Sequence, residues 1–140
     1  MTTLPRTLAT VTTITMVLIA CAGQPSEESL ARDQAVRDFV EVRDLVEADR
    51  ARVSDRDGWT EITARYIIYR SRNAYLFEFY QPCYALRDNT RIVADVRAEP
   101  NLIRARFDTL RGCRIDRIYP LTEAEAAELK AIGEAPGERN

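Results

Sequence analysis

Hydrophobic residues recur with two different periods along the chain, and the change of period divides it. Over residues 30–50 they fall three or four positions apart, which is typical of an amphipathic helix, whereas over residues 59–119 they mostly alternate as in strands. A second helical segment runs from residue 122 to residue 133. This order predicts an α+β fold, with an N-terminal helix, about five antiparallel strands in a small curved sheet or half-barrel, and a short C-terminal helix.

The predicted N-terminal helix covers residues 27–50. Ser26 can cap it, and Asp33 and Arg37 have the spacing of an i,i+4 ion pair. Its apolar face comprises Ala35, Val36, Phe39, Val40, Val42, Leu45 and Val46. Such a face either packs on the protein's own sheet or binds a partner, and we favour the sheet.

Five segments have the pattern of strands: residues 59–70, 74–80, 91–97, 102–110 and 113–119. In the first, we expect Ile62, Ala64, Tyr66 and Ile68 to lie on one face of the sheet, and Ile67 and Tyr69 on the other. After the strands, Thr122 and Glu125 have the spacing of a capping box that begins the C-terminal helix.

The first twenty-one residues have the pattern of a lipoprotein export signal. Arg6 is followed by 14 uncharged residues, a stretch too short for an ordinary membrane-spanning helix. Leu18-Ile19-Ala20-Cys21 then matches a lipobox, which predicts cleavage before Cys21 and a membrane anchor through lipid on that cysteine. An uncleaved anchor, or an ordinary signal peptide that contains a cysteine, is the alternative.

These features predict the organisation of the whole chain. We expect a signal peptide at residues 1–20, a lipidated cysteine and tether at 21–26, the helix at 27–50, a single β-rich domain with the C-terminal helix at 51–135, and a disordered tail at 136–140. Ala22 stands where an Asp favours inner-membrane retention in enteric lipoproteins. The predicted location is therefore the bacterial cell envelope, at the periplasmic face of the outer membrane.

Charge is distributed unevenly along the mature chain. Residues 50–117 contain 14 arginines and 9 acidic residues, a net charge of +5, whereas residues 21–49 carry −5 and residues 118–140 carry −3. A basic centre between acidic ends favours ion pairs within the molecule, or a basic face toward anionic lipid. The internal pairs are the simpler interpretation.

Once Cys21 is lipidated, Cys83 and Cys113 remain as a pair. In an exported domain the simplest interpretation is one structural disulfide, worth about 3–4 kcal/mol on the chain-entropy model. A redox-active pair and a metal site are alternatives. The Cys-x-x-Cys spacing of redox pairs is absent, however, and the sequence has no histidine to complete a zinc site.

The sequence contains no motif for catalysis, a cofactor or a metal. The absence of histidine excludes Ser-His-Asp and Cys-His catalysis, and no phosphate-binding glycine loop is present. Glu78 and Asp95 are candidate general acid–base residues only in the sense that both lie on predicted strands. Tyrosines interspersed with arginines resemble a nucleic-acid platform, but an envelope location makes nucleic acid a poor partner.

Residues 59–121 resemble a domain-of-unknown-function family of small exported proteobacterial proteins. The matching residues are Trp59, Asn73-Ala74-Tyr75-Leu76, Pro82-Cys83, Leu86, Phe107-Asp108, Cys113-Arg114-Ile115 and Ile118-Tyr119-Pro120-Leu121. The resemblance implies a signal or lipobox together with the two cysteines, which supports a bridge between them. It implies no activity, substrate or cofactor, and the charged helix before Trp59 lies outside it.

Two functional hypotheses follow. The first is a non-enzymatic lipoprotein that faces the periplasm, is held to the membrane through lipidated Cys21, and acts as a structural or protein-interaction module with an envelope protein as its partner. The second is a carrier or sensor that binds a small amphiphile or envelope component.

Overall fold

A computed structural model describes residues 26–53, 58–86, 94–96 and 101–134, and it confirms the α+β fold class. Its elements are α1 (Glu27–Val42), β1 (Arg50–Arg52), β2 (Gly58–Thr63), β3 (Tyr66–Arg70), β4 (Ala74–Phe79), the 3-10 turn η1 (Tyr84–Leu86), β5 (Ala94–Val96), β6 (Leu102–Arg104), β7 (Thr109–Leu110), β8 (Cys113–Leu121) and α2 (Glu123–Gly133).

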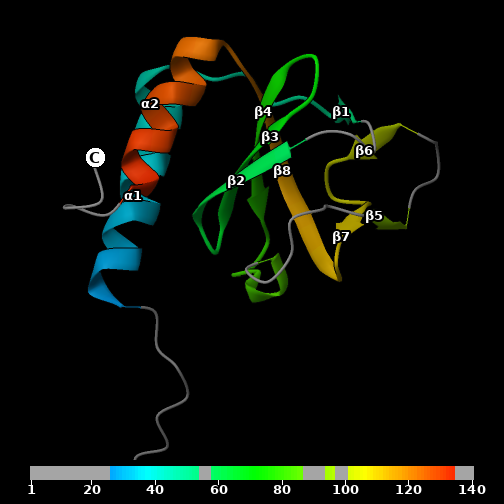
Figure 1. Ribbon diagram of the computed structural model, residues 1–140, viewed down its shortest axis with the longest axis horizontal. Coiled ribbons are helices and arrows are strands. Elements are labelled where there is room, and N and C mark those ends of the chain that lie inside the picture. The colour runs from blue at the N-terminus through cyan, green and yellow to red at the C-terminus, as the bar shows by residue number, and fades with distance from the viewer. Residues whose placement is uncertain (1–25, 54–57, 87–93, 97–100, 135–140) are drawn as a thin grey trace, which may run out of the picture.

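The strands form one curved antiparallel sheet and a separate two-stranded ribbon. The sheet has six strands in the order β2-β3-β4-β8-β7-β5, and the ribbon pairs β1 with β6. β8 joins the two halves of the sheet, because its C-terminal part pairs with β4 and its first residues pair with β7. Figure 1 shows α1 and α2 on one side of the sheet and the β1–β6 ribbon toward the other.

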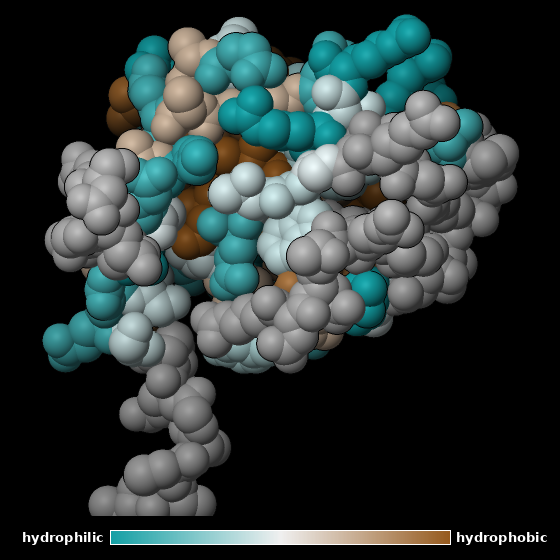
Figure 2. All heavy atoms as spheres, viewed as in Figure 1, coloured by the Kyte–Doolittle hydropathy of each residue, from teal (hydrophilic) through white to brown (hydrophobic). Residues whose placement is uncertain are grey.

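Both faces of the central strands are buried, which explains their nearly continuous apolar sequence. In β3, Tyr66 and Ile68 lie in a core cluster with helix residues such as Val36, whereas Ile67 and Tyr69 lie in a second cluster on the opposite face. The predicted face assignments for these four residues are confirmed. On the face of the molecule drawn in Figure 2, hydrophobic residues are visible in the middle, and hydrophilic side chains lie mostly toward the margin.

The second cluster is closed by the ribbon and by residues after β4. Its members beyond the central strands include Ala51, Val53, Cys83, Leu86, Ile103, Ala105 and Leu110. The disulfide between Cys83 and Cys113 lies here, with the two Cα atoms 5.7 Å apart. It connects the segment after β4 to the first residue of β8, as the sequence predicts.

The N-terminal helix is shorter than the predicted 27–50 helix. It ends at Val42 because Asp44 adopts a left-handed conformation (φ 49°) and the chain closes a Schellman motif. In that motif the Asp44 N–H donates to the Glu41 carbonyl, and the Leu45 N–H donates to the Val40 carbonyl, both at 3.1 Å. Residues 43–49, which the sequence predicts to be helical, form a turn and an irregular segment, and Arg50, the last residue of the predicted helix, is the first residue of β1.

Two of the predicted strands are each divided. The predicted strand 59–70 is a hairpin, in which β2 and β3 are joined through Ala64 and Arg65. The predicted strand 102–110 is interrupted after Arg104, since Arg106 has a φ of 65° and the Asp108 carboxylate accepts a hydrogen bond from the Arg104 N–H at 2.7 Å. The main sheet therefore has one strand more than the predicted number, and β1–β6 is an additional ribbon.

The caps of both helices are as predicted. The Ser26 hydroxyl accepts from the Ser29 N–H at 3.2 Å, and Thr122 and Glu125 form a reciprocal capping box. Hydrogen bonds from Thr122 hold the pKa of Glu125 below its usual value. At the end of α2, a Cβ on Gly133 would lie 2.9 Å from the Ile62 Cα, so glycine permits the close approach of α2 to β2.

The acidic ends of the chain pair with its basic centre. Arg70 in β3 lies 2.9 Å from Glu123 of α2, and Arg106 lies 2.6 Å from Glu47. These pairs are largely exposed, so each stabilises the fold only slightly. They are examples of the internal ion pairs that the uneven charge predicts.

Substitution of Val36 tests whether α1 packs on the sheet. It is fully buried, whereas Val42 on the same helix is 82% exposed. We expect Val36→Ala to reduce the free energy of unfolding by about 1–3 kcal/mol through lost burial and a cavity. The matched control Val42→Ala should change it by less than about 0.5 kcal/mol in urea titrations. Equal effects of the two substitutions would contradict the packing.

The disulfide supports a second prediction. Reduction of the Cys83–Cys113 bond should lower the free energy of unfolding by about 3–4 kcal/mol, because the unfolded chain regains the entropy of the closed loop. Chemical denaturation with and without reductant measures this. A Cys83→Ala, Cys113→Ala double variant should be as unstable as the reduced protein and insensitive to reductant; a reductant effect of the same size in that variant would refute the assignment.

Candidate functional site

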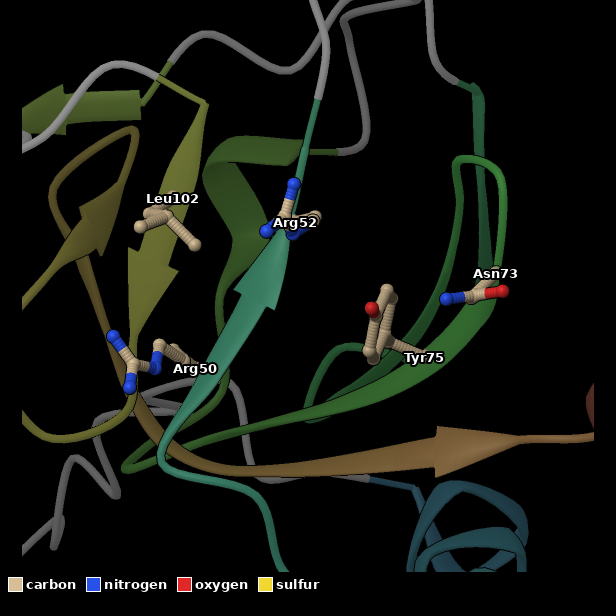
Figure 3. Close-up of a pocket in the computed structure, with 5 residues that line it drawn as sticks. All are labelled: Arg50, Arg52, Asn73, Tyr75 and Leu102. Carbon is tan, nitrogen blue, oxygen red and sulfur yellow. The ribbon is translucent and has the colours of Figure 1, made fainter.

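A basic cleft lies between the β1–β6 ribbon and the start of β4. It is lined by Arg50, Arg52, Asn73, Tyr75 and Leu102 and has a volume of about 290 Å³. Figure 3 shows the two arginines on β1, Leu102 on the adjacent β6, and Asn73 and Tyr75 across from them at the β4 side. Segments far apart in the sequence therefore meet at this cleft.

The alternation of β1 directs its arginines outward. Ala51 is 1% exposed and pairs with Ile103, so the residues on either side of Ala51 face away from the core. The register places Arg50 opposite Arg104 and Arg52 opposite Leu102. The outer face of the ribbon thus carries three guanidinium groups, of which that of Arg104 lies 5.3 Å from the centre of the Phe107 ring.

Arg50 and Arg52 differ from several other arginines of the fold in whether they form ion pairs. Arg43, Arg70 and Arg106 each form an ion pair with a glutamate. Within the described part of the chain, Arg50 and Arg52 form none. The groups across the cleft, the Asn73 amide and the Tyr75 phenol, are neutral. The cleft therefore presents positive charge together with neutral hydrogen-bonding groups.

A second polar cleft, of about 240 Å³, lies where α1 crosses the sheet. It is lined by Arg37, Val40, Glu41, Tyr66, Glu78, Arg117 and Tyr119. The Tyr66 hydroxyl donates to the Glu78 carboxylate at 3.1 Å, and Arg117 lies 3.9 Å from the other Glu78 oxygen. Glu78 is thus held between a phenol and a guanidinium, in an arrangement suited to joining the strands β3, β4 and β8.

The tyrosines of this second cleft have raised pKa values. Burial, and then the charge and hydrogen bond of Glu78, hold the pKa of Tyr66 far above its usual value of 10.0, against a smaller opposite effect of Arg37. Burial also raises the pKa of Tyr119, although Arg117 opposes it. Hydrogen bonding and charge from Tyr119, together with Glu78, raise the pKa of Arg117. Both phenols therefore remain protonated under ordinary conditions, and that of Tyr66 donates to Glu78.

The structure does not bring the two candidate carboxylates together. Glu78 lies on β4 and Asp95 on β5, and the strands β8 and β7 separate β4 from β5 in the sheet. The Asp95 side chain lies outside what the structure describes. Among the described residues there is also no group of three or more Cys, Asp and Glu side chains arranged to hold a metal ion.

The three predicted modification sites have different outcomes. Cys83 and Cys113 are joined to each other, whereas Cys21, the predicted lipidation site, lies outside the described residues. In residues 26–53, 58–86, 94–96 and 101–134, no helix has the length and apolar character needed to cross a membrane. The basic cleft was not predicted, and its one signal in the sequence is the Arg-Ala-Arg alternation at residues 50–52.

The chain matches one known protein family over most of its length. The model of a family of unknown function, DUF6491, matches residues 4–135. The chain belongs to this family. The matched range includes Cys21, Cys83 and Cys113, as well as every residue of the basic cleft. No curated protein and no solved structure matches this DUF6491 chain.

The raised pKa of Tyr66 predicts a pH dependence of stability. Above about pH 10 the unfolded chain releases its tyrosine protons while folded Tyr66 keeps its own, so the free energy of unfolding should fall as pH rises. Tyr66→Phe should make this fall shallower in urea titrations between pH 8 and 11. The control Tyr80→Phe, at a side chain that is 62% exposed, should leave the slope unchanged. An unchanged slope in Tyr66→Phe would contradict the assignment.

Proposed function

We propose that this protein is an exported bacterial lipoprotein, anchored through lipid on Cys21, whose folded domain faces the periplasm as a non-enzymatic interaction module. The observation that carries the proposal is the lipobox Leu18-Ile19-Ala20-Cys21, whose first three residues end an uncharged stretch of 14 residues. The DUF6491 match begins at residue 4, so this segment belongs to the region that the family shares.

The disulfide supports export. Bonds such as Cys83–Cys113 persist in oxidising compartments and are rare in the cytosol. The Cys83 side chain is buried in the core cluster beside Leu86, which favours a structural over a redox-active role. Both cysteines are therefore accounted for by the fold, which leaves Cys21 for the anchor.

The short tether places the domain close to the membrane. Ser26 caps α1, so four residues separate the proposed lipidated cysteine from the folded domain. At no more than about 3.5 Å for each residue, this segment keeps the domain within about 20 Å of the lipid. Such a protein is suited to binding other envelope components near the bilayer surface, an envelope protein among them.

A second candidate function is that of a carrier or sensor for an envelope component. The basic cleft favours it, because it combines two arginines with the apolar side chain of Leu102 and the ring of Tyr75. That combination suits a ligand with an anionic head more than a wholly apolar ligand.

Labelling with radioactive palmitate tests the anchor. Cells that express the natural chain should incorporate label into the protein, and Cys21→Ser should abolish the label and release the protein from membranes. The matched control, a Cys83→Ser, Cys113→Ser double variant, should keep its label. Continued labelling of Cys21→Ser would refute the anchor, and sedimentation of the natural protein with the inner membrane would refute the outer-membrane location.

A further inference from the structure

We propose that the basic cleft binds a phosphoryl group carried by an envelope molecule. Arg50 and Arg52 would hold its oxygens, and Asn73, Tyr75 and Leu102 would surround the rest of the head group. The inference rests on the second candidate function and names its ligand chemistry. It depends on the fold of the cleft and not on the lipid anchor.

Arg50 and Arg52 place two positive charges side by side at the mouth of the cleft. Arg50 and Arg52 protrude from the same face of β1, at a separation of about 7 Å along the strand. Within the described residues, neither has a carboxylate partner, although glutamates neutralise arginines elsewhere in the fold. Two adjacent cations that have no counter-charge among the described residues attract an anion, and charge-assisted hydrogen bonds favour its binding.

The wall of the cleft opposite the arginines is built on the well-ordered start of β4. Tyr75 is 7% exposed, and its backbone pairs with Tyr69 on one side and Pro120 on the other. Asn73 precedes it in the β3–β4 turn, where the Asn73 carbonyl accepts from the Ser71 N–H at 3.0 Å. The buried Tyr75 ring and the backbone of Asn73 are therefore held in place before a ligand arrives, which reduces the entropy lost on binding.

The donor groups of the cleft match a phosphomonoester better than a carboxylate. A guanidinium offers a planar fork that fits a phosphate or a carboxylate, but a single carboxylate requires only one arginine. Two arginines match the double charge of a phosphomonoester. The volume of about 290 Å³ fits a head group of modest size, and Leu102 provides an apolar contact for the carbon skeleton attached to it.

Calorimetric titration of the full-length protein in a non-ionic detergent tests the proposal with three probes. These are inorganic phosphate, dihexanoyl phosphatidic acid as a soluble lipid phosphomonoester, and dihexanoyl phosphatidylcholine as its zwitterionic counterpart. We expect phosphatidic acid to bind more tightly than phosphatidylcholine, with an affinity that decreases as the salt concentration rises. Selective binding of phosphatidic acid identifies a lipid head group, whereas equal binding of inorganic phosphate identifies a free phosphoryl ligand.

Substitutions then assign the binding to the cleft. An Arg50→Gln, Arg52→Gln double variant should weaken binding of the preferred probe at least tenfold. Arg114→Gln, which removes an exposed arginine positioned over the Tyr80 ring, should change it less than twofold. Urea unfolding should show both variants folded, since these side chains are exposed. Binding of neither phosphate probe, or an equal loss in both variants, would overturn the proposal. Loss of palmitate labelling in Cys21→Ser has no bearing on this result, so the two proposals fail separately.

Discussion

The fold depends on covering both faces of β3 and β4. Ile67 and Phe77 point to one side of the sheet and Ile68 and Leu76 to the other, and all four are at most 1% exposed. Antiparallel sheets commonly leave one face in water, but these strands cannot. The helices therefore cover one face, and the β1–β6 ribbon with the segment after β4 covers the other. The positions of the two polar clefts described above follow from that requirement.

Local chemistry made part of this arrangement predictable. The alternation in β3 defined the two faces, and the side chains of Ser26 and Thr122 marked the helix starts because caps depend on residues within one turn. The Cys83–Cys113 bond was predictable because only two cysteines remain after Cys21. In each case the deciding residues are close in sequence, or they are the only ones of their kind.

The end of α1, the β2–β3 turn and the partner of Asp33 could not be predicted from the hydrophobic periodicity or from local motifs. Asp44 ends α1 without the usual glycine, and Ala64-Arg65 turns between β2 and β3 without glycine or proline. Asp33 has the spacing to pair with Arg37, yet it is buried and accepts a hydrogen bond from Thr63 of β2, while Arg37 donates to Gln34. At Asp33 a contact with β2 thus overrode the local pairing, and at the other two sites the chain turns without the residues that usually mark a turn.

The basic cleft was unpredictable for the same reason, and its origin follows from the ribbon. β1 has only three residues, and its partner β6 lies about fifty positions later in the sequence. The ribbon exists because Ala51 and Ile103 close the core, and the alternation of a strand then forces Arg50 and Arg52 outward. Glutamates near the two ends of the chain neutralise other arginines: Glu47 pairs with Arg106, Glu123 with Arg70 and Glu128 with Arg43. Among the described residues, no carboxylate forms an ion pair with Arg50 or Arg52. A packing requirement on one face of the ribbon thus concentrates positive charge on its other face, and this charge is the physical basis of the anion binding that we propose.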